Sequence, residues 1–158
     1  MNEKPTIIVD TREQKPYKFS GSIRMKLDAG DYGVLGSDGK PMPIAVERKT
    51  AGELPGIVGK QRKRFVRELE RLAELDSSAI VIESGLYNIV QPNPFSNVPP
   101  KAIINSLVSW MLRYKIPVLF CDSRRYAKAV TYYYLERYWI HKNLEEKARS
   151  DDESKPRG

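Results

Sequence analysis

Short apolar runs recur along the chain, with turn-forming residues on either side. The runs at residues 6–10, 78–83 and 116–121 are rich in valine and isoleucine. Apolar, β-branched runs of this length are typical of strands buried on both faces. The pattern therefore predicts three core strands, one near the amino terminus and two in the second half of the chain.

Amphipathic and proline-opened segments separate these runs and predict helices. Residues 60–75 carry apolar side chains at helical spacing and a charged opposite face, which predicts an amphipathic helix. We expect two further helices at 99–115, opened by prolines, and at 122–141. The proline-rich stretch 85–100 predicts a long loop, and the charged tail 144–158 is expected to be disordered.

The first half of the chain adds an antiparallel pair of strands. Residues 26–35 and 44–49 flank a turn at Asp38-Gly39, which predicts a β-hairpin. Strands that alternate with helices in the second half predict a parallel portion of the sheet. The predicted fold class is α/β, a mixed central β-sheet flanked by helices, with one domain over residues 1–143.

The second strand of the hairpin ends in an acid and an amine. Because side chains alternate along a strand, Glu47 and Lys49 lie on one face, about 7 Å apart. Folding about the turn near Gly39 brings Asp31 opposite Glu47. Two carboxylates with open positions suit Mg²⁺ or Mn²⁺, and a neighbouring lysine can activate water or stabilise a phosphorane-like charge. The alternative is a surface ion pair at a strand end.

Polar residues also follow the first predicted strand, at Asp10, Arg12 and Glu13. Strand ends in α/β sheets are common places for active-site residues. The planar guanidinium of Arg12 can hold a phosphate, and Glu13 can hold a metal-bound water. The alternative is a capping and salt-bridge cluster without a catalytic role.

Composition narrows the class of protein. The net charge of +7 favours a polyanionic partner, most often nucleic acid. A single cysteine, Cys121, rules out an internal disulfide and a CxxC zinc site, and a single histidine, His141, argues against a histidine-dependent triad. The segment at Gly59-Lys60 lacks the remaining residues of a phosphate-binding P-loop, so we expect no nucleotide triphosphate.

Targeting signals are also missing from the pattern. No apolar run approaches the length of a membrane span, and the amino terminus lacks a signal-peptide core. We therefore expect no membrane association. We expect a soluble, intracellular protein, in the cytoplasm of a prokaryote or a virus-infected host. A nuclear location is the alternative.

Taken in order, these motifs resemble the nuclease domain of the XPF family of structure-specific endonucleases. That family's pattern is Asp-x-Arg-Glu, then Gly-Asp, then Glu-Arg-Lys-x-x-x-Asp. The chain matches it with VDTRE at 9–13, AGDY at 29–32 and VERK at 46–49, and the resemblance extends over residues 6–135. It implies a restriction-endonuclease-like fold and divalent-metal-dependent cleavage of DNA, at branched, flap or single-strand/duplex junction sites.

The resemblance also implies roles for individual residues. The implied catalytic residues are Asp10, Arg12, Glu13, Asp31, Glu47, Arg48 and Lys49. Metal ligation is implied for Asp31 and Glu47, with Asp10 and Glu13 nearby. Arg48 should point away from Glu47 if the strand is regular. Glu53 departs from the family, which has aspartate there. Many relatives carry a tandem helix-hairpin-helix domain for duplex binding; we expect none here, so a partner that supplies duplex binding is one expectation.

Two helices carry further candidate contacts. Lys60, Gln61 and Arg64 begin a basic helix and are expected to bind the DNA backbone, although a solvated helix face is the alternative. Aromatic residues crowd the segment 126–142, which is consistent with base stacking, packing against the sheet or a homodimer interface. The expected function is a metal-dependent DNA endonuclease. The alternatives are a catalytically silent DNA-binding or scaffolding domain and a dimeric four-way-junction resolvase.

Overall fold

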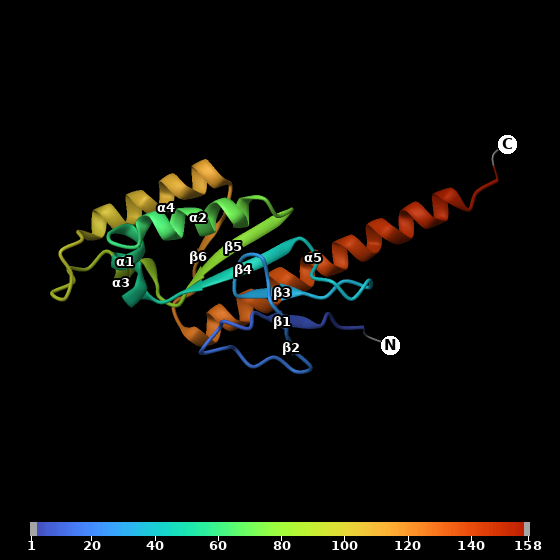
Figure 1. Ribbon diagram of the computed structural model, residues 1–158, viewed down its shortest axis with the longest axis horizontal. Coiled ribbons are helices and arrows are strands. Elements are labelled where there is room, and N and C mark those ends of the chain that lie inside the picture. Colours follow the sequence, from blue (N-terminus) through green and yellow to red (C-terminus); the bar gives the residue numbers. More distant parts are fainter. Residues whose placement is uncertain (1–2, 157–158) are drawn as a thin grey trace.

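The computed structural model describes residues 3–156, which form one mixed sheet with helices on both faces (Figure 1). Six strands lie in the order β2-β1-β3-β4-β5-β6. The strands are β1 (Ile7–Val9), β2 (Ile23–Arg24), β3 (Tyr32–Val34), β4 (Ile44–Lys49), β5 (Ser77–Ile82) and β6 (Val118–Phe120). This arrangement confirms the predicted α/β class with a mixed central sheet.

Helices cover the two faces of the sheet unequally. The helical segments are the 3-10 turn η1 (Ala51–Glu53), α1 (Leu54–Val58), α2 (Arg62–Ala73), α3 (Leu86–Ile89), α4 (Pro100–Tyr114) and α5 (Arg124–Glu153). Helices α1, α2 and α4 pack together on one face, whereas the single long helix α5 packs against β3, β4 and β5 on the other (Figure 1).

The strand directions bring the carboxyl ends of five strands, β1, β2, β4, β5 and β6, to one edge of the sheet. Strands β4, β5 and β6 are parallel, and β3 runs antiparallel to both β1 and β4. Strand β1 is therefore parallel to β4. Residues that directly follow β1, β4, β5 and β6 lie along one edge, where the active sites of α/β proteins are commonly found.

Alternation along the central strands divides the core into two clusters. Ala45, Ile80 and Ile82 pack on the side of α2 and α4, whereas Val46 and Val81 pack on the side of α5. All five are almost completely buried. Because successive side chains of a strand point to opposite faces, this alternation also decides the face on which each polar residue at the strand ends lies.

The last helix is longer than the sequence pattern predicts. Helix α5 runs to Glu153 rather than ending near His141, and the expected disorder from residue 144 is wrong for 144–153. These residues are mostly good helix formers, and the first strong stop signal is Pro156. The carboxyl-terminal half of α5 projects beyond the sheet (Figure 1).

The pattern also missed four short elements, β2, η1, α1 and α3. Segments of two to five residues are too short to show a hydrophobic period, so only the tertiary structure reveals them. Within residues 3–156, no helix is both long enough and apolar enough to cross a membrane.

Candidate active site

The hairpin of β3 and β4 places two carboxylates at facing positions. Tyr32 pairs with Val46, so Asp31 and Glu47 are the next facing pair along the ladder. The backbone N–H of Asp31 donates to the carbonyl of Val46 over 2.9 Å. Asp31 Oδ2 in turn accepts a 2.8 Å hydrogen bond from the backbone N–H of Arg48. The register expected from the position of the turn is confirmed.

A glycine makes this close approach of the chain possible. Gly30 has a φ of +80°, and a Cβ atom on it would lie 2.7 Å from the Cβ of Ala45. Only glycine adopts this conformation without strain, and a larger side chain has no room. The N–H of Gly30 donates over 2.9 Å to the carboxylate of Glu68 on α2, which fixes the position of Asp31 relative to that helix.

A cleft of about 490 Å³ lies between this edge of the sheet and α2. The residues expected from the sequence that line the cleft are Asp10, Arg12, Asp31, Glu47, Lys49, Gln61 and Arg64. Other residues that line it are Gly30, Glu53, Ile57, Phe65, Glu68 and Arg71. The structure therefore gathers most of the predicted site residues from four separate segments, but not Glu13, Arg48 or Lys60.

Burial governs the ionisation of the two facing carboxylates. Burial raises the pKa of Asp31 from its usual 3.8 to about 6, although the hydrogen bond from the N–H of Arg48 opposes the rise. Burial, followed by the charge of Asp31, raises the pKa of Glu47 well above its usual range. The side chain of Glu47 is only 9% exposed. Two carboxylates that are desolvated together favour a cation between them.

Lys49 supplies one positive charge beside this pair. Its Nζ lies 3.3 Å from Glu47 Oε1 and 3.5 Å from Glu53 Oε2. Burial alone would lower the pKa of Lys49, but the charges of Glu47, Glu53 and Asp31 raise it above its usual value. This geometry places an ammonium group where it can orient a water molecule or stabilise negative charge beside Glu47.

The donor set fits a hard divalent cation. Asp31 and Glu47 supply carboxylate oxygens at an open cleft, and one ammonium group does not neutralise two carboxylates and Glu53 together. Oxygen ligands of this kind suit Mg²⁺ or Mn²⁺. Within residues 3–156, no group of three or more acidic, histidine or cysteine side chains converges as a ready metal cluster. A cation here would therefore depend on the Asp31–Glu47 pair.

Asp10 is engaged by other groups. Its Oδ1 accepts a 2.8 Å hydrogen bond from the backbone N–H of Leu27, and its Oδ2 accepts from the backbone N–H of Arg12 at 3.0 Å. The guanidinium of Arg12 binds the same carboxylate, with Nε 2.9 Å from Oδ2. This geometry gives Asp10 the role of orienting Arg12, whose side chain remains 63% exposed at the cleft. Metal ligation by Asp10 stays a prediction.

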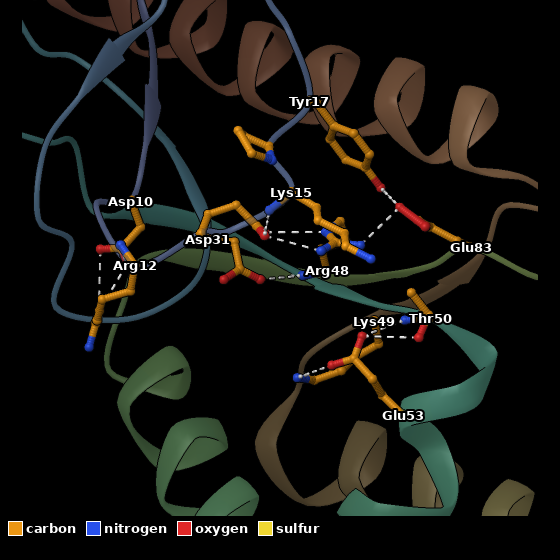
Figure 2. A network of polar contacts seen from close by, with 12 residues as sticks. Asp10, Arg12, Lys15, Tyr17, Asp31, Arg48, Lys49, Thr50, Glu53 and Glu83 are labelled. Atoms are coloured by element: carbon orange, nitrogen blue, oxygen red, sulfur yellow. Dashed lines mark hydrogen bonds and ion pairs between the residues drawn. The ribbon is translucent and has the colours of Figure 1, made fainter.

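Arg48 and Glu13 meet on the opposite face of β4. The guanidinium of Arg48 binds both carboxylate oxygens of Glu13, at 3.1 and 3.2 Å, and also lies 3.3 Å from Glu83. All three side chains are at most 10% exposed. Figure 2 shows Arg48 and Glu83 on one side of the strand and Lys49 with Glu53 on the other. The predicted direction of Arg48 is confirmed, and this pair serves as a buried support beneath the cleft.

Several contributing residues escaped prediction. Glu68 was not among the predicted site residues, yet its carboxylate reaches the cleft, where it accepts from the N–H of Gly30 and pairs with Arg71. Glu83 follows β5 and accepts from both Arg48 and Arg124, so its place at a strand end was an available signal. Glu53 accepts from the backbone N–H of Thr50 at 3.0 Å, as the Thr-x-x-Glu spacing of a capping box predicts.

Comparison with known proteins bears on this geometry. The chain has a TM-score of 0.65 to XPF from Aeropyrum pernix in complex with DNA, at 22% identity, covering 87% of this chain and 66% of that one. A second structure of XPF from Aeropyrum pernix gives 0.67 at 20% identity, covering 91% and 69%. The chain thus spans about two thirds of the length of these structures. No curated protein sequence matches the chain.

The structural matches establish a restriction-endonuclease-like fold of the XPF type. A family model described as the ERCC4 domain matches residues 9–134, which is most of the chain. The chain therefore belongs to the ERCC4 domain family, and the resemblance drawn from the three motifs is confirmed.

Proposed function

We propose that this protein is a divalent-metal-dependent DNA endonuclease that hydrolyses phosphodiester bonds. The observation that carries the proposal is the pair of desolvated carboxylates, Asp31 and Glu47, beside the protonated Lys49 in an open cleft. Membership of the ERCC4 domain family and the fold shared with a DNA-bound XPF structure support it.

The positive groups around the cleft fit a phosphodiester backbone. Arg12, Arg64 and Arg71 line the same space as the two carboxylates. Arg12 is held in place by Asp10, so its guanidinium is preorganised for a phosphate oxygen. In the proposed complex, these arginines hold the phosphates that flank the scissile bond.

Asp31 and Glu47 would hold the metal ion, Mg²⁺ or Mn²⁺. When bound, such an ion supplies Lewis acidity and lowers the pKa of a coordinated water. Lys49 lies beside Glu47 and has a different task. Its ammonium group would orient the attacking water and stabilise the negative charge that develops on the phosphate.

The substrate is proposed to be branched, flap or single-strand/duplex junction DNA. The similarity to a DNA-bound XPF structure supports this class. The rival proposal of a silent DNA-binding or scaffolding domain is disfavoured by the cleft, which retains both facing acids and the lysine. A four-way-junction resolvase requires a dimer, and the residues described here give no specific support for one.

The test is cleavage of a labelled panel of single-stranded, duplex, flap, splayed and four-way-junction DNA with Mg²⁺, Mn²⁺ or EDTA. The proposal predicts metal-dependent cleavage that Glu47→Gln abolishes. Glu70→Gln is the matched control, because Glu70 is exposed and does not line the cleft. Cleavage that persists in EDTA or in Glu47→Gln would contradict the proposal. Binding without cleavage of any substrate would favour the silent domain.

A further inference from the structure

A second groove lies on the α5 side of the sheet. Its lining residues are Phe19, Arg125, Lys128, Ala129, Tyr132 and Tyr133, and its volume is about 360 Å³. Three of them are aromatic and two are basic, and none is acidic. The groove has no part in the cleft chemistry described above.

The aromatic rings of this groove are held in place but remain accessible. Phe19 packs at 5.9 Å, edge to face, on the buried Tyr32, and its ring lies 6.1 Å from that of Tyr132. Tyr133 follows with its ring 6.3 Å from Tyr132, and it is 61% exposed. The exposed ring of Tyr133, set edge to face against Tyr132, offers an apolar ring face of the kind on which a base stacks.

Charge at the groove favours an anionic ligand. The Nζ of Lys128 lies 5.7 Å from the centre of the Phe19 ring, and the side chain of Arg125 is exposed beside it. Lys18, also exposed, precedes Phe19 in the chain. A stacked base at Phe19 and Tyr133 would therefore have its phosphates within reach of cationic groups.

One segment joins this groove to the catalytic cleft. Residues 10–19 begin at the cleft with Asp10 and Arg12 and end in the groove with Phe19. Arg12, Lys15 and Lys18 are exposed along this segment, whereas its two acids, Asp10 and Glu13, are buried and paired with Arg12 and Arg48. The exposed charge along this segment is therefore entirely positive.

The segment is also anchored to the first turn of α5. The guanidinium of Arg124 donates to the carbonyl oxygens of Lys15 and Pro16 over 2.8 and 3.2 Å, and it lies 4.7 Å from the ring centre of Tyr17. The basic segment and the aromatic groove are thus fixed relative to each other. A preformed path of this kind binds a flexible strand at lower cost than a mobile one.

We propose that the groove of Phe19, Tyr132 and Tyr133 is a binding site for single-stranded DNA, which reaches it from the cleft along Arg12, Lys15 and Lys18. Stacked bases fill the groove, and the three basic side chains follow the phosphates. Such a site favours substrates with an unpaired arm over continuous duplex. The inference rests on DNA as the substrate of the proposed function, but it does not require cleavage.

The test uses the full chain carrying Glu47→Gln, in EDTA, so that no DNA is cut. Anisotropy measures the Kd for a labelled oligothymidylate and for a duplex. Tyr133→Ala should weaken the single strand about tenfold and leave the duplex unchanged. Tyr87→Ala is the control, because Tyr87 is 76% exposed on α3 and lies outside the groove and the cleft. Circular dichroism confirms that each variant is folded.

Two further measurements test whether single-stranded DNA binds at this groove. An oligothymidylate containing 5-iododeoxyuridine should photocrosslink to Phe19, Tyr132 or Tyr133. Removing Lys18 by Lys18→Gln should reduce the slope of log Kd against log salt by about 0.7, the value for one phosphate contact on a single strand. Crosslinks confined to the cleft, or an unchanged Kd in Tyr133→Ala, would overturn the proposal.

A second copy of this chain is the rival occupant of the groove. If the chain is dimeric in solution and Tyr133→Ala makes it monomeric, the groove is a dimer interface, and the proposal is overturned. The outcome of the DNA-binding test is independent of the nuclease test. Failure to cleave DNA would leave single-strand binding at the groove intact, and loss of that binding would leave metal-dependent cleavage intact.

Discussion

Arg48 supports Asp31 through its backbone while its side chain binds Glu13 on the far face of the strand. The N–H of Arg48 donates to Asp31 Oδ2 over 2.8 Å, and its guanidinium makes two hydrogen bonds with Glu13 at 3.1 and 3.2 Å. One residue thus connects the cleft to a buried ion pair. Two residues that the family pattern places among the catalytic set therefore act here from beneath the site.

This relationship predicts that Glu13→Gln acts first on stability. Removing one partner of a buried pair leaves an uncompensated charge, which costs about 3–5 kcal/mol. Glu83 still contacts Arg48, so we expect the lower part of that range. Urea unfolding measures the loss. The control is Glu145→Gln, whose solvent-exposed pair with Lys142 should contribute little to stability. Equal effects of the two variants would contradict the buried role.

The raised pKa of Asp31 predicts that Asp31→Asn stabilises the metal-free protein. The pKa of Asp31 is about 6 when folded against 3.8 usually, so the ionised carboxylate destabilises the fold above pH 6. The penalty is absent below 3.8, where the group is protonated in both states. Asn can still accept the N–H of Arg48. The expected gain is up to roughly 3 kcal/mol above pH 6, from about 1.36 kcal/mol per pKa unit.

Unfolding of both proteins in urea with EDTA, as a function of pH, measures this gain. The difference between Asp31→Asn and the wild type should shrink steadily as pH falls from above 6 toward 3.8. Mg²⁺ should stabilise the wild type and not the variant. A variant that is less stable at pH above 6 in EDTA would show that Asp31 is not strained by burial.

Lys49→Gln is expected to slow cleavage strongly while DNA binding persists. Loss of one preorganised donor to developing charge typically lowers kcat by about 10²–10³. Single-turnover rates and Kd for DNA separate the two effects. Because Lys49 is a cation beside Glu47, its removal should also tighten Mn²⁺ binding. The matched control is Lys63→Gln, an exposed residue of α2 outside the cleft. A variant with unchanged kcat would remove Lys49 from the mechanism.

Comparison of Gly30→Ala with Gly39→Ala distinguishes the cost of backbone strain from that of a steric clash. Both glycines have positive φ, +80° and +77°, but a Cβ on Gly39 meets nothing within 4 Å, whereas one on Gly30 lies 2.7 Å from Ala45. Gly39→Ala should cost about 1–2 kcal/mol from backbone strain alone. Gly30→Ala should cost more and should also displace Asp31 and slow cleavage. Equal losses in thermal stability, with cleavage unaffected, would contradict this account of the turn.

The sequence was sufficient to predict the parts of the site that follow from strand periodicity. The turn near Gly39 set Asp31 opposite Glu47, and alternation placed Lys49 with Glu47 and Arg48 on the other face. Both inferences depend only on local geometry, which a strand repeats every two residues.

The parts that depend on how elements pack were not predictable in this way. Glu13 lies in a turn after β1, where no period fixes the direction of a side chain, and only the fold turns it toward Arg48. Glu68 reaches Gly30 because α2 docks across the sheet edge at a particular rotation. The length of α5 was also missed, since a charged composition is compatible both with an exposed helix and with disorder.

Calorimetric titration with Mn²⁺, in the absence of DNA, tests most directly the claim that Asp31 and Glu47 form the metal site. The wild type should bind Mn²⁺ saturably, and Asp31→Asn and Glu47→Gln should each lose that binding. Asp10→Asn should retain it if Asp10 serves Arg12, and its loss there would make Asp10 a ligand. Undiminished binding in both Asp31→Asn and Glu47→Gln would contradict the account and place the metal elsewhere.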